Sequence, residues 1–225
     1  MNEIVKNYEV LLADVKEKSN GRTLLLPVSK TFPASDIKIL YDHGVRCFAE
    51  NRLQELEPKS KELPQDIEWH FIGHLQSNKV KKVVPLSSYI HSVDSVSLLD
   101  KIDRTAADLQ HHIKCFLEFK PDGEDSKTGA DITLADEMFK RAENCSEYCQ
   151  ICGIMGMAPL GGSPEENRAA FKKLHDLMIY ANEKFDLNLS QLSMGMSGDY
   201  IEAITEGSTI VRIGSAIFGK RVYQI

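Results

Sequence analysis

Thr23-Leu24-Leu25-Leu26-Pro27-Val28, followed directly by Ser29-Lys30-Thr31, is the stretch of sequence that best indicates the fold. From Leu24 to Val28 it is continuously apolar, without the alternation of a strand that faces water on one side. Short runs of this kind are typical of parallel strands buried on both faces. The polar residues that follow at once, with a lysine among them, predict a functional loop at the end of the strand.

Seven further runs of the same kind lie downstream. They are Arg46–Glu50, Trp69–Ile72, Tyr89–Val93, Lys114–Phe119, Cys152–Met157, Gln191–Met194 and Thr209–Gly214. Helical stretches separate them, and one begins with the capping box Ser163-Pro164-Glu165-Glu166. A leading amphipathic helix precedes the first strand, with Ile4, Tyr8, Leu11, Leu12 and Val15 on one face.

Strand and helix thus alternate eight times, which favours an α/β fold. We expect a single (β/α)8 TIM-type barrel with an extra N-terminal helix, spanning residues 1–225 as one domain. A chain of this length is ordinary for one barrel. An open, doubly wound sheet is the alternative, because periodicity alone does not decide whether the sheet closes.

The composition limits the function. With 42% hydrophobic and 27% charged residues and a net charge of −6, the chain resembles a globular protein without a general affinity for nucleic acid or membranes. The basic cluster Asn78–Lys82 is interpreted as an exposed helix face. No apolar run approaches the ~20 residues of a membrane span, and nothing at the N-terminus resembles a secretory signal. A cytoplasmic protein with reduced thiols is therefore expected.

Three of the five cysteines have a suggestive spacing. Cys145, Cys149 and Cys152 follow C-x3-C-x2-C, which can hold an iron–sulfur cluster and would make the chain an iron–sulfur barrel enzyme. Against this, the segment is predicted to pass from the end of a helix into a strand, whereas cluster ligands need a loop that wraps the metal. Buried free cysteines are the alternative, and we expect no metal site. The histidines show no convincing metal-ligand spacing either.

The loops after the strands should carry the function, because barrels of this kind place their sites at the carboxyl ends of the strands. The first loop supplies Lys30, the second Asn51 and the third His74. The last two loops, Met194–Asp199 and Arg212–Ala216, are rich in glycine and serine. Such turns aim backbone N–H groups at an anion, and barrels often bind phosphate after strands seven and eight. A phosphate site is expected there.

Lys30 is a candidate for covalent chemistry. It lies two positions past the apolar strand, between Pro27 and Pro33, which stiffen the backbone. A functional lysine here should be partly buried with its pKa depressed toward neutrality, so that the free amine can add to an aldehyde. With a phosphate site across the same mouth, the ligand would be a phosphorylated aldehyde. A lysine that is merely exposed is the alternative.

Six segments closely resemble the pyridoxal phosphate homeostasis protein family. They are Pro27–Thr31, Phe48–Glu55, Trp69–Lys79, Gly153–Pro159, Ser193–Asp199 and Val211–Gly219. The match runs in order, with few gaps, from about Leu24 to Arg221. That family resembles the barrel domain of alanine racemase without its second domain.

The resemblance implies that pyridoxal 5′-phosphate is the cofactor and that Lys30 holds it as a Schiff base. It further implies that Ser197, Gly214 and Ser215 bind the phosphate and that Arg212 faces the pyridine nitrogen. Asn51 and His74 match polar positions that line the pocket.

Other readings remain open for three of these residues. Ser197 and Asn51 could be helix caps, and His74 could be a structural histidine. The chain also departs from the family pattern twice. Ala49 stands where glycine is usual, which could crowd the pocket wall. Phe119-Lys120 stands where a valine–asparagine pair is more common, so a pocket role for Lys120 is open.

Two classes of function follow from the resemblance. The first is a protein that binds, stores or delivers pyridoxal phosphate in vitamin B6 homeostasis. Such a protein would pass the cofactor to apo-enzymes, would have no catalytic residues of its own, and would be a monomer or weak homodimer. The second is a pyridoxal-phosphate-dependent amino-acid racemase. Racemisation needs a base on each face of the substrate carbon. The resembling racemase completes its site with a second domain, which we expect to be missing here because the sequence ends soon after its last barrel strand. The binding role is therefore favoured.

Overall fold

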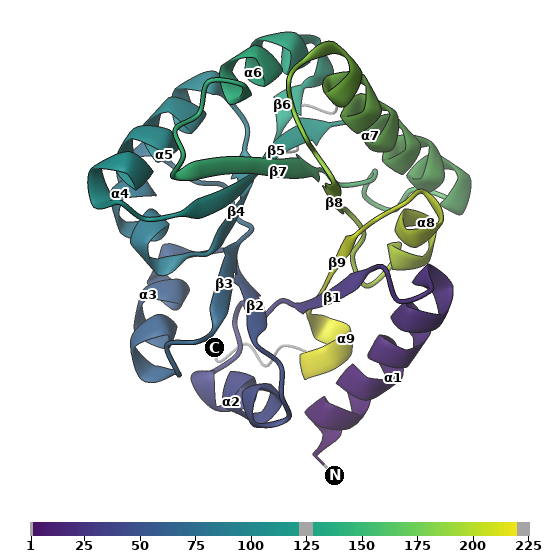
Figure 1. Ribbon diagram of the computed structural model, residues 1–225. Coiled ribbons are helices and arrows are strands. Elements are labelled where there is room, and N and C mark those ends of the chain that lie inside the picture. The colour runs from purple at the N-terminus through teal and green to yellow at the C-terminus, as the bar shows by residue number, and fades with distance from the viewer. Residues whose placement is uncertain (1, 122–127, 220–225) are drawn as a thin grey trace.

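Eight parallel strands form the wall of a barrel in the computed structural model, which describes residues 2–121 and 128–219. They are β1 (Leu24–Pro27), β2 (Cys47–Glu50), β3 (Glu68–Phe71), β4 (Tyr89–Val93), β5 (Ile113–Lys120), β7 (Cys149–Met155), β8 (Gln191–Ser193) and β9 (Ile210–Ile213). Each overlaps one of the eight apolar runs. Figure 1 looks along the barrel and shows these strands in a ring with the helices outside it.

The order of the strands around the ring is β1-β9-β8-β7-β5-β4-β3-β2. The gap between β1 and β2 is bridged just past β1, where Val28 pairs with Ala49. There the Ser29 N–H donates to the Ala49 carbonyl oxygen at 2.9 Å. The sheet is therefore a nearly closed barrel, as expected, and an open doubly wound sheet is excluded.

The main helices alternate with the strands. They are α1 (Glu3–Ser19), α2 (Ala34–Asp42), α3 (Leu53–Glu62), α4 (Val80–Val83), α5 (Val96–Leu109), α6 (Ala135–Ala142), α7 (Pro164–Lys184), α8 (Tyr200–Thr205) and α9 (Ser215–Phe218), with short 3-10 turns at Ser77–Lys79, Val84–Leu86 and Ile132–Leu134. The predicted capping box opens α7, where Ser163 and Glu166 each accept from the other's backbone N–H.

The extra N-terminal helix α1 is present. Its first turn is capped by Asn2, whose side chain accepts from the Ile4 N–H at 2.8 Å. Val5, Tyr8 and Val15 are buried on one face, and α1 packs against α2, α8 and α9 (Figure 1). Helix α1 therefore covers one side of the barrel with its apolar face.

Two apolar clusters fill the molecule. The larger lies between the helices and the outer face of the sheet. The smaller joins Leu26, Val28, Ala49, Phe116, Cys152, Met155 and Ile210, which come from β1, β2, β5, β7 and β9 and the residue after β1. Because these segments surround the barrel, the smaller cluster lies in its interior.

One strand was not expected. Ala130–Asp131 forms β6, which pairs in parallel with the end of β5 through Phe119–Ala130 and Lys120–Asp131. The polar, glycine-containing stretch from Lys120 to Ala130 indicates a loop, but its first residue ends β5 and its last residue begins β6. The middle of that loop, 122–127, lies outside the described residues.

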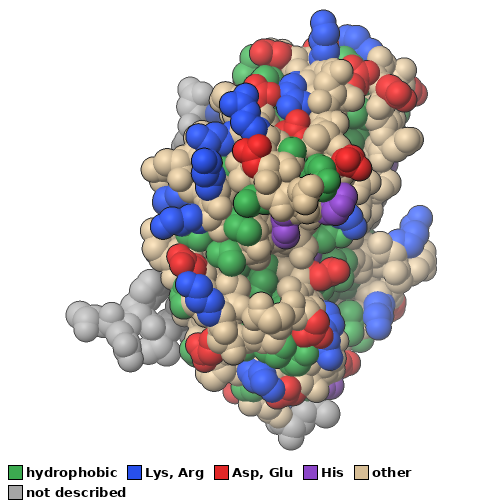
Figure 2. All heavy atoms as spheres, turned by 60° about the vertical axis from the view of Figure 1, so that its left-hand side comes forward, with side chains coloured by type: hydrophobic (Ala, Val, Ile, Leu, Met, Phe, Trp, Pro, Cys, Tyr) green, Lys and Arg blue, Asp and Glu red, His purple; other side chains and the backbone are tan. Residues whose placement is uncertain are grey.

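The surface agrees with the charge analysis. The predicted helix face at Asn78–Lys82 is helical, and Lys81 and Lys82 are exposed. On the face shown in Figure 2, basic and acidic side chains are both present and spread among apolar ones. Within residues 2–121 and 128–219, no helix has the length and apolarity needed to cross a bilayer.

Candidate cofactor site

Five of the seven predicted site residues line one cavity at the carboxyl ends of the strands. The cavity has a volume of about 240 Å3 and is lined by Val28, Lys30, Phe32, Ile72, Met196, Ser197, Gly198, Arg212, Gly214 and Ser215. The sequence singled out Lys30, Ser197, Arg212, Gly214 and Ser215 among these. The lining contains two cationic side chains and no carboxylate, so it suits an anionic ligand.

Lys30 lies in a turn, and the residues on either side of it, Ser29 and Thr31, are held by hydrogen bonds. The Ser29 hydroxyl donates to Glu50 Oε1 at 2.7 Å, and the Thr31 N–H donates to Glu55 Oε2. Thr31 has a φ of 71°, a left-handed conformation that is uncommon outside glycine and must be held by its surroundings. Lys30 itself is half-buried, as expected for a functional lysine in this loop.

A buried ion pair supports this turn from below. Lys59 Nζ lies 2.6 Å from Glu50 Oε1 and 3.1 Å from Glu55 Oε2, and it also donates to the Ser29 carbonyl oxygen at 3.0 Å. Burial raises the pKa of Glu50, and the charge of Lys59 partly offsets this. The carboxylates that hold the residues on either side of Lys30 are thus gathered around one ammonium group.

The expected phosphate side of the cavity is formed by two loops. Ser197 and Gly198 come from the loop between β8 and α8, and Gly214 and Ser215 lie where β9 leads into α9. The first residues of a helix have N–H groups without an intrahelical acceptor, so Ser215 can donate outward. A Cβ atom on Gly214 would come within 3.0 Å of the Val28 carbonyl oxygen, so glycine permits this close approach.

Ser197 is exposed and is not the N-cap of α8. That position belongs to Asp199, whose carboxylate accepts from the Met196 N–H. The capping alternative for Ser197 is therefore wrong. Ser197 lines the cavity, where a ligand could accept from its hydroxyl.

Arg212 enters the cavity from β9 and is almost completely buried. Its NH1 donates to the Ser193 carbonyl and hydroxyl oxygens, and its NH2 donates to the Gly156 carbonyl oxygen at 3.2 Å. Burial lowers the pKa of Arg212 from its usual 12.5 to about 10, against the favourable charges of Glu118 and Asp199. The guanidinium therefore stays charged near neutral pH and acts only as a hydrogen-bond donor.

Glu118 is a buried carboxyl group that the sequence analysis did not identify. It lies on β5, and Glu118 Oε1 accepts from the Thr128 hydroxyl at 2.6 Å, while Oε2 has no partner among the described residues. Burial raises the pKa of Glu118 to about 7, although the Thr128 hydrogen bond and Arg212 oppose the shift. Its charge therefore changes close to neutrality, near the guanidinium of Arg212.

Asn51 and His74 line a different cavity. Together with Arg52, Gln76 and Lys79, they border a neighbouring space of about 640 Å3. His74 Nδ1 lies 3.3 Å from Asp94 Oδ2, and the side-chain oxygen of Asn51 has no partner among the described residues. Helix α3 begins after Arg52 without a side-chain cap, so Asn51 is not its N-cap.

The two departures from the family pattern lie in the wall of the barrel. Ala49 is fully buried in β2 and belongs to the interior cluster, and its carbonyl oxygen accepts the Ser29 N–H that bridges β1 and β2. Lys120 ends β5 beside Asp131. Neither residue is among those that line the Lys30 cavity.

The iron–sulfur interpretation is contradicted by the positions of the cysteines. Cys149 begins β7 and packs in the outer cluster, whereas Cys152 lies three residues further along the same strand and packs inside the barrel. Side chains alternate between the faces of a strand, so residues three apart point to opposite sides. Within residues 2–121 and 128–219, the potential metal-ligand group near these cysteines is Asp103, Cys145 and Cys149, without Cys152.

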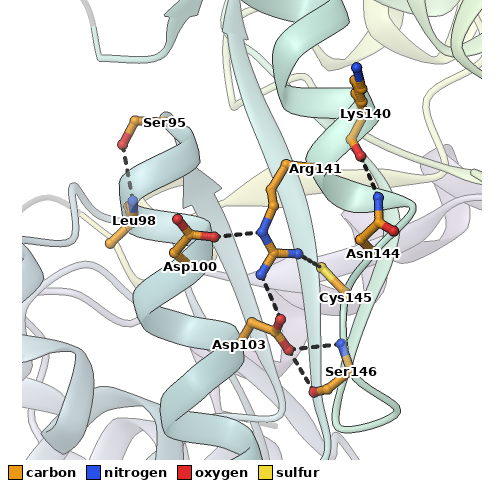
Figure 3. A network of polar contacts seen from close by, with 9 residues as sticks. All are labelled: Ser95, Leu98, Asp100, Asp103, Lys140, Arg141, Asn144, Cys145 and Ser146. Carbon is orange, nitrogen blue, oxygen red and sulfur yellow. Dashed lines mark hydrogen bonds and ion pairs between the residues drawn. The ribbon is translucent and has the colours of Figure 1, made fainter.

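The guanidinium of Arg141 lies beside this group of potential metal ligands and contacts two of them. Arg141 lies 2.7 Å from Asp103 Oδ2, pairs with Asp100, and donates to Cys145 Sγ at 3.5 Å (Figure 3). Hydrogen bonds with neighbouring thiols, together with burial, raise the pKa values of Cys145 and Cys149, which keeps both protonated. The arrangement joins α5 to α6 and the turn that follows, and it does not resemble a metal centre.

Sequence reasoning missed the apolar lining of the cavity and the residues behind it. Phe32, Ile72 and Met196 carry no chemical signal, since each resembles an ordinary core residue. A buried carboxylate at the end of a strand, Glu50, was a usable signal. Its partner Lys59 was not, because a buried lysine has no sequence signature.

Comparison with known proteins defines the class to which this fold and site belong. Residues 3–222 match the family model of the alanine racemase N-terminal domain. A pyridoxal phosphate homeostasis protein from Synechocystis is 42% identical over 203 residues, covering 88% of this chain and 91% of that protein. Another from Aquifex aeolicus is 38% identical over 200 residues, covering 88% and 87%.

Solved structures agree with this class. PipY of Synechococcus elongatus, without pyridoxal phosphate, has 36% identity and a TM-score of 0.89, and the match covers 96% of this chain and 100% of that one. PipY with pyridoxal phosphate bound has 35% identity and a TM-score of 0.87, with the same coverage. Alanine racemase of Clostridium difficile shares the fold at 14% identity, and the match covers 59% of that chain. The chain belongs to the alanine racemase N-terminal domain family, among the pyridoxal phosphate homeostasis proteins.

Proposed function

We propose that this protein binds pyridoxal 5′-phosphate as a Schiff base on Lys30 and takes part in vitamin B6 homeostasis without catalytic turnover. The observation that carries the proposal is the lining of the Lys30 cavity, with two cations, two serines, two glycines and no carboxylate. Its relatives named pyridoxal phosphate homeostasis proteins, and the PipY structure with that cofactor bound, support the same ligand.

The residues of the cavity fit the parts of the cofactor. Lys30 supplies an amine for the aldehyde. The Ser197 hydroxyl and the backbone N–H groups of Gly214 and Ser215 supply donors for the phosphate, while Arg212 supplies a donor for the ring nitrogen. Bound cofactor would bring an aldehyde and an electron-accepting ring. For Asn51 and His74, which line the neighbouring cavity, we propose a polar wall beside the cofactor.

The side chains in the cavity support the proposed absence of turnover. Among its described lining residues, Lys30 is the one side chain with an amine that could serve as a base, because Arg212 stays charged. Racemisation needs two bases on opposite faces of the substrate carbon. An amino-acid racemase is the second candidate function, and the fold shared with alanine racemase supports it.

The remaining expectations form part of the same proposal. Residues 1–225 would act as a single cofactor-binding domain in the cytoplasm, as a monomer or weak homodimer, with apo-enzymes as receivers of the cofactor. An absorbance spectrum of the purified protein, before and after borohydride, tests the central claim. A Schiff-base band that borohydride abolishes is expected, and colourless protein that stays colourless with added pyridoxal phosphate would contradict it.

A further inference from the structure

A line of hydrogen bonds crosses the interior of the barrel behind Arg212. Arg212 NH1 donates to Ser193 Oγ at 2.8 Å, and Ser193 Oγ lies 2.8 Å from His91 Nδ1. His91 Nε2 in turn lies 2.9 Å from His70 Nδ1. The four side chains come from β9, β8, β4 and β3, and none is more than 4% exposed. The line therefore runs through the barrel, shielded from water.

The direction of these hydrogen bonds is set at the Arg212 end. A guanidinium can only donate, so Ser193 Oγ accepts from Arg212. His91 Nδ1 is the other hydrogen-bond partner that the described residues offer to this oxygen, so the serine hydroxyl hydrogen points to His91. His91 then has its acceptor at Nδ1 and its proton at Nε2, from which it donates to His70 Nδ1. His70 likewise carries its proton on Nε2.

Both imidazoles are neutral, so the direction of each hydrogen bond fixes which ring nitrogen carries the proton. Burial lowers the pKa of His70 to about 3 and that of His91 well below its usual 6.5. A neutral imidazole has one donor and one acceptor. The reverse direction would leave the Ser193 hydroxyl hydrogen buried without an acceptor, whereas His70 Nε2 has no described partner in either case. The reverse direction thus has one more buried unsatisfied group, which is costly.

We infer that Ser193, His91 and His70 are positioning residues that hold the Arg212 guanidinium in the cavity, with both histidines fixed in the Nε2–H tautomer. This inference rests on the proposed function only for the ligand that Arg212 meets. Ser193 presents two acceptors to the guanidinium, its carbonyl and hydroxyl oxygens, and His91 prevents the hydroxyl from turning away. Arg212 therefore keeps one orientation in the cavity, from which it would donate to the ring nitrogen of bound cofactor.

Nitrogen NMR of histidine-labelled protein without cofactor tests the tautomers directly. His91 and His70 are expected to carry their protons on Nε2 and to remain neutral from pH 5 to pH 8. In Ser193→Ala, His91 Nδ1 loses its donor, so a mixture of tautomers is expected. The same variant should bind pyridoxal phosphate about tenfold more weakly, because Arg212 loses one of its buried acceptors.

Ser92→Ala is the matched control. Ser92 is a fully buried serine next to His91 in sequence, and its hydroxyl has no partner among the described residues. Its removal should change neither tautomers nor affinity. A proton on His91 Nδ1 in the wild-type protein overturns the assigned direction.

Two further outcomes separate this inference from the proposed function. Unchanged tautomers and unchanged affinity in Ser193→Ala overturn the positioning role. A wild-type protein that forms no adduct on Lys30 overturns the proposed function instead, while the tautomers measured without cofactor still decide the direction of the line.

Discussion

Lys59 Nζ lies 2.6 Å from Glu50 Oε1 beneath the turn that carries Lys30. Glu50 is fully buried, and the side chain of Lys59 is 9% exposed. Removing two charges from water is costly, so a buried pair is poor evidence of net stabilisation. Removing one partner of the pair is strongly destabilising, because the other charge then remains buried without compensation. The same ammonium also binds the Ser29 carbonyl oxygen, so the pair joins stability to the shape of the site.

The first prediction concerns this pair. Lys59→Met should lower the free energy of unfolding by about 3–5 kcal/mol, because Glu50 remains as an uncompensated buried carboxylate. Denaturant unfolding at neutral pH measures the change, and adding Glu50→Gln to the variant should recover part of it. Lys61→Met on the same helix is the control, since Lys61 pairs with Glu57 in an exposed position and should leave stability nearly unchanged. Equal effects of the two substitutions would show that the buried pair has no special role.

The second prediction is a pH dependence of stability. Burial raises the pKa of Glu118 from its usual 4.5 to about 7, so between these values the folded protein holds a proton that the unfolded chain releases. The stability that this proton contributes is present below about pH 4.5 and is lost as the pH rises through 7. The free energy of unfolding of Glu118→Gln, relative to that of the wild type, should therefore rise by on the order of 3 kcal/mol between pH 4 and pH 8. Urea unfolding at both pH values checks this, with the exposed Glu62→Gln as control. A difference that does not change with pH would mean that Glu118 titrates normally.

The strands could be predicted because each is an apolar run that the barrel buries on both faces. β6 could not be, since Ala130–Asp131 is only two residues long and exists through its pairing with β5. The separation of Cys149 from Cys152 follows from the period of two along β7. A cysteine spacing that suits a metal-binding loop therefore does not predict a metal site when the segment is a strand.

The grouping of residues in the candidate cofactor site was predictable to the extent that the carboxyl ends of the strands meet at one rim. This brought Lys30 together with Arg212 and Gly214, although they are far apart in sequence. It did not separate the Lys30 cavity from the neighbouring one that Asn51 and His74 line. Which way a loop side chain points depends on the path of its backbone, and residue spacing does not encode that path.

The third prediction is covalent. Borohydride should attach pyridoxal phosphate to the peptide that contains Lys30, because this lysine lines the proposed cofactor cavity. Lys30→Ala should lose the Schiff-base absorption while it retains the circular dichroism of the wild type. Lys120→Ala, at the end of β5 and outside that lining, should retain the absorption. An adduct mapped mainly to another lysine would falsify the assignment.

The fourth prediction concerns the phosphate. Charge-assisted hydrogen bonds from the Ser197 hydroxyl and the Gly214 and Ser215 N–H groups should contribute roughly 1.5–3 kcal/mol each. Pyridoxal without phosphate should then bind at least about a hundredfold more weakly than pyridoxal phosphate. Ser197→Ala should weaken binding of pyridoxal phosphate about tenfold and leave that of pyridoxal unchanged, as measured by titration. Near-equal affinities of the wild type for the two compounds would contradict the phosphate site.

The last prediction concerns catalysis, and it depends on Arg212. Catalysis with this cofactor usually needs a protonated ring nitrogen, which a carboxylate partner maintains. Arg212 only donates hydrogen bonds, so a ring nitrogen that faces it must remain unprotonated in order to accept one. Its withdrawal of electrons is then weakened, and the described lining of the cavity offers no second base beside Lys30.

D- or L-alanine should therefore exchange its α-hydrogen with deuterated solvent no faster in the presence of this protein than with free pyridoxal phosphate. Arg212→Glu should lower retention of the cofactor more than it raises the exchange, because a buried carboxylate would replace the donor that Ser193 and Gly156 hold in place. Arg22→Glu, an exposed arginine that donates to the Ser19 carbonyl oxygen, is the control and should change neither quantity. Mass spectrometry of the amino acid measures the exchange. Racemisation by the wild type at an ordinary enzymatic turnover of ~1 per second or more would establish the racemase function in place of the binding function.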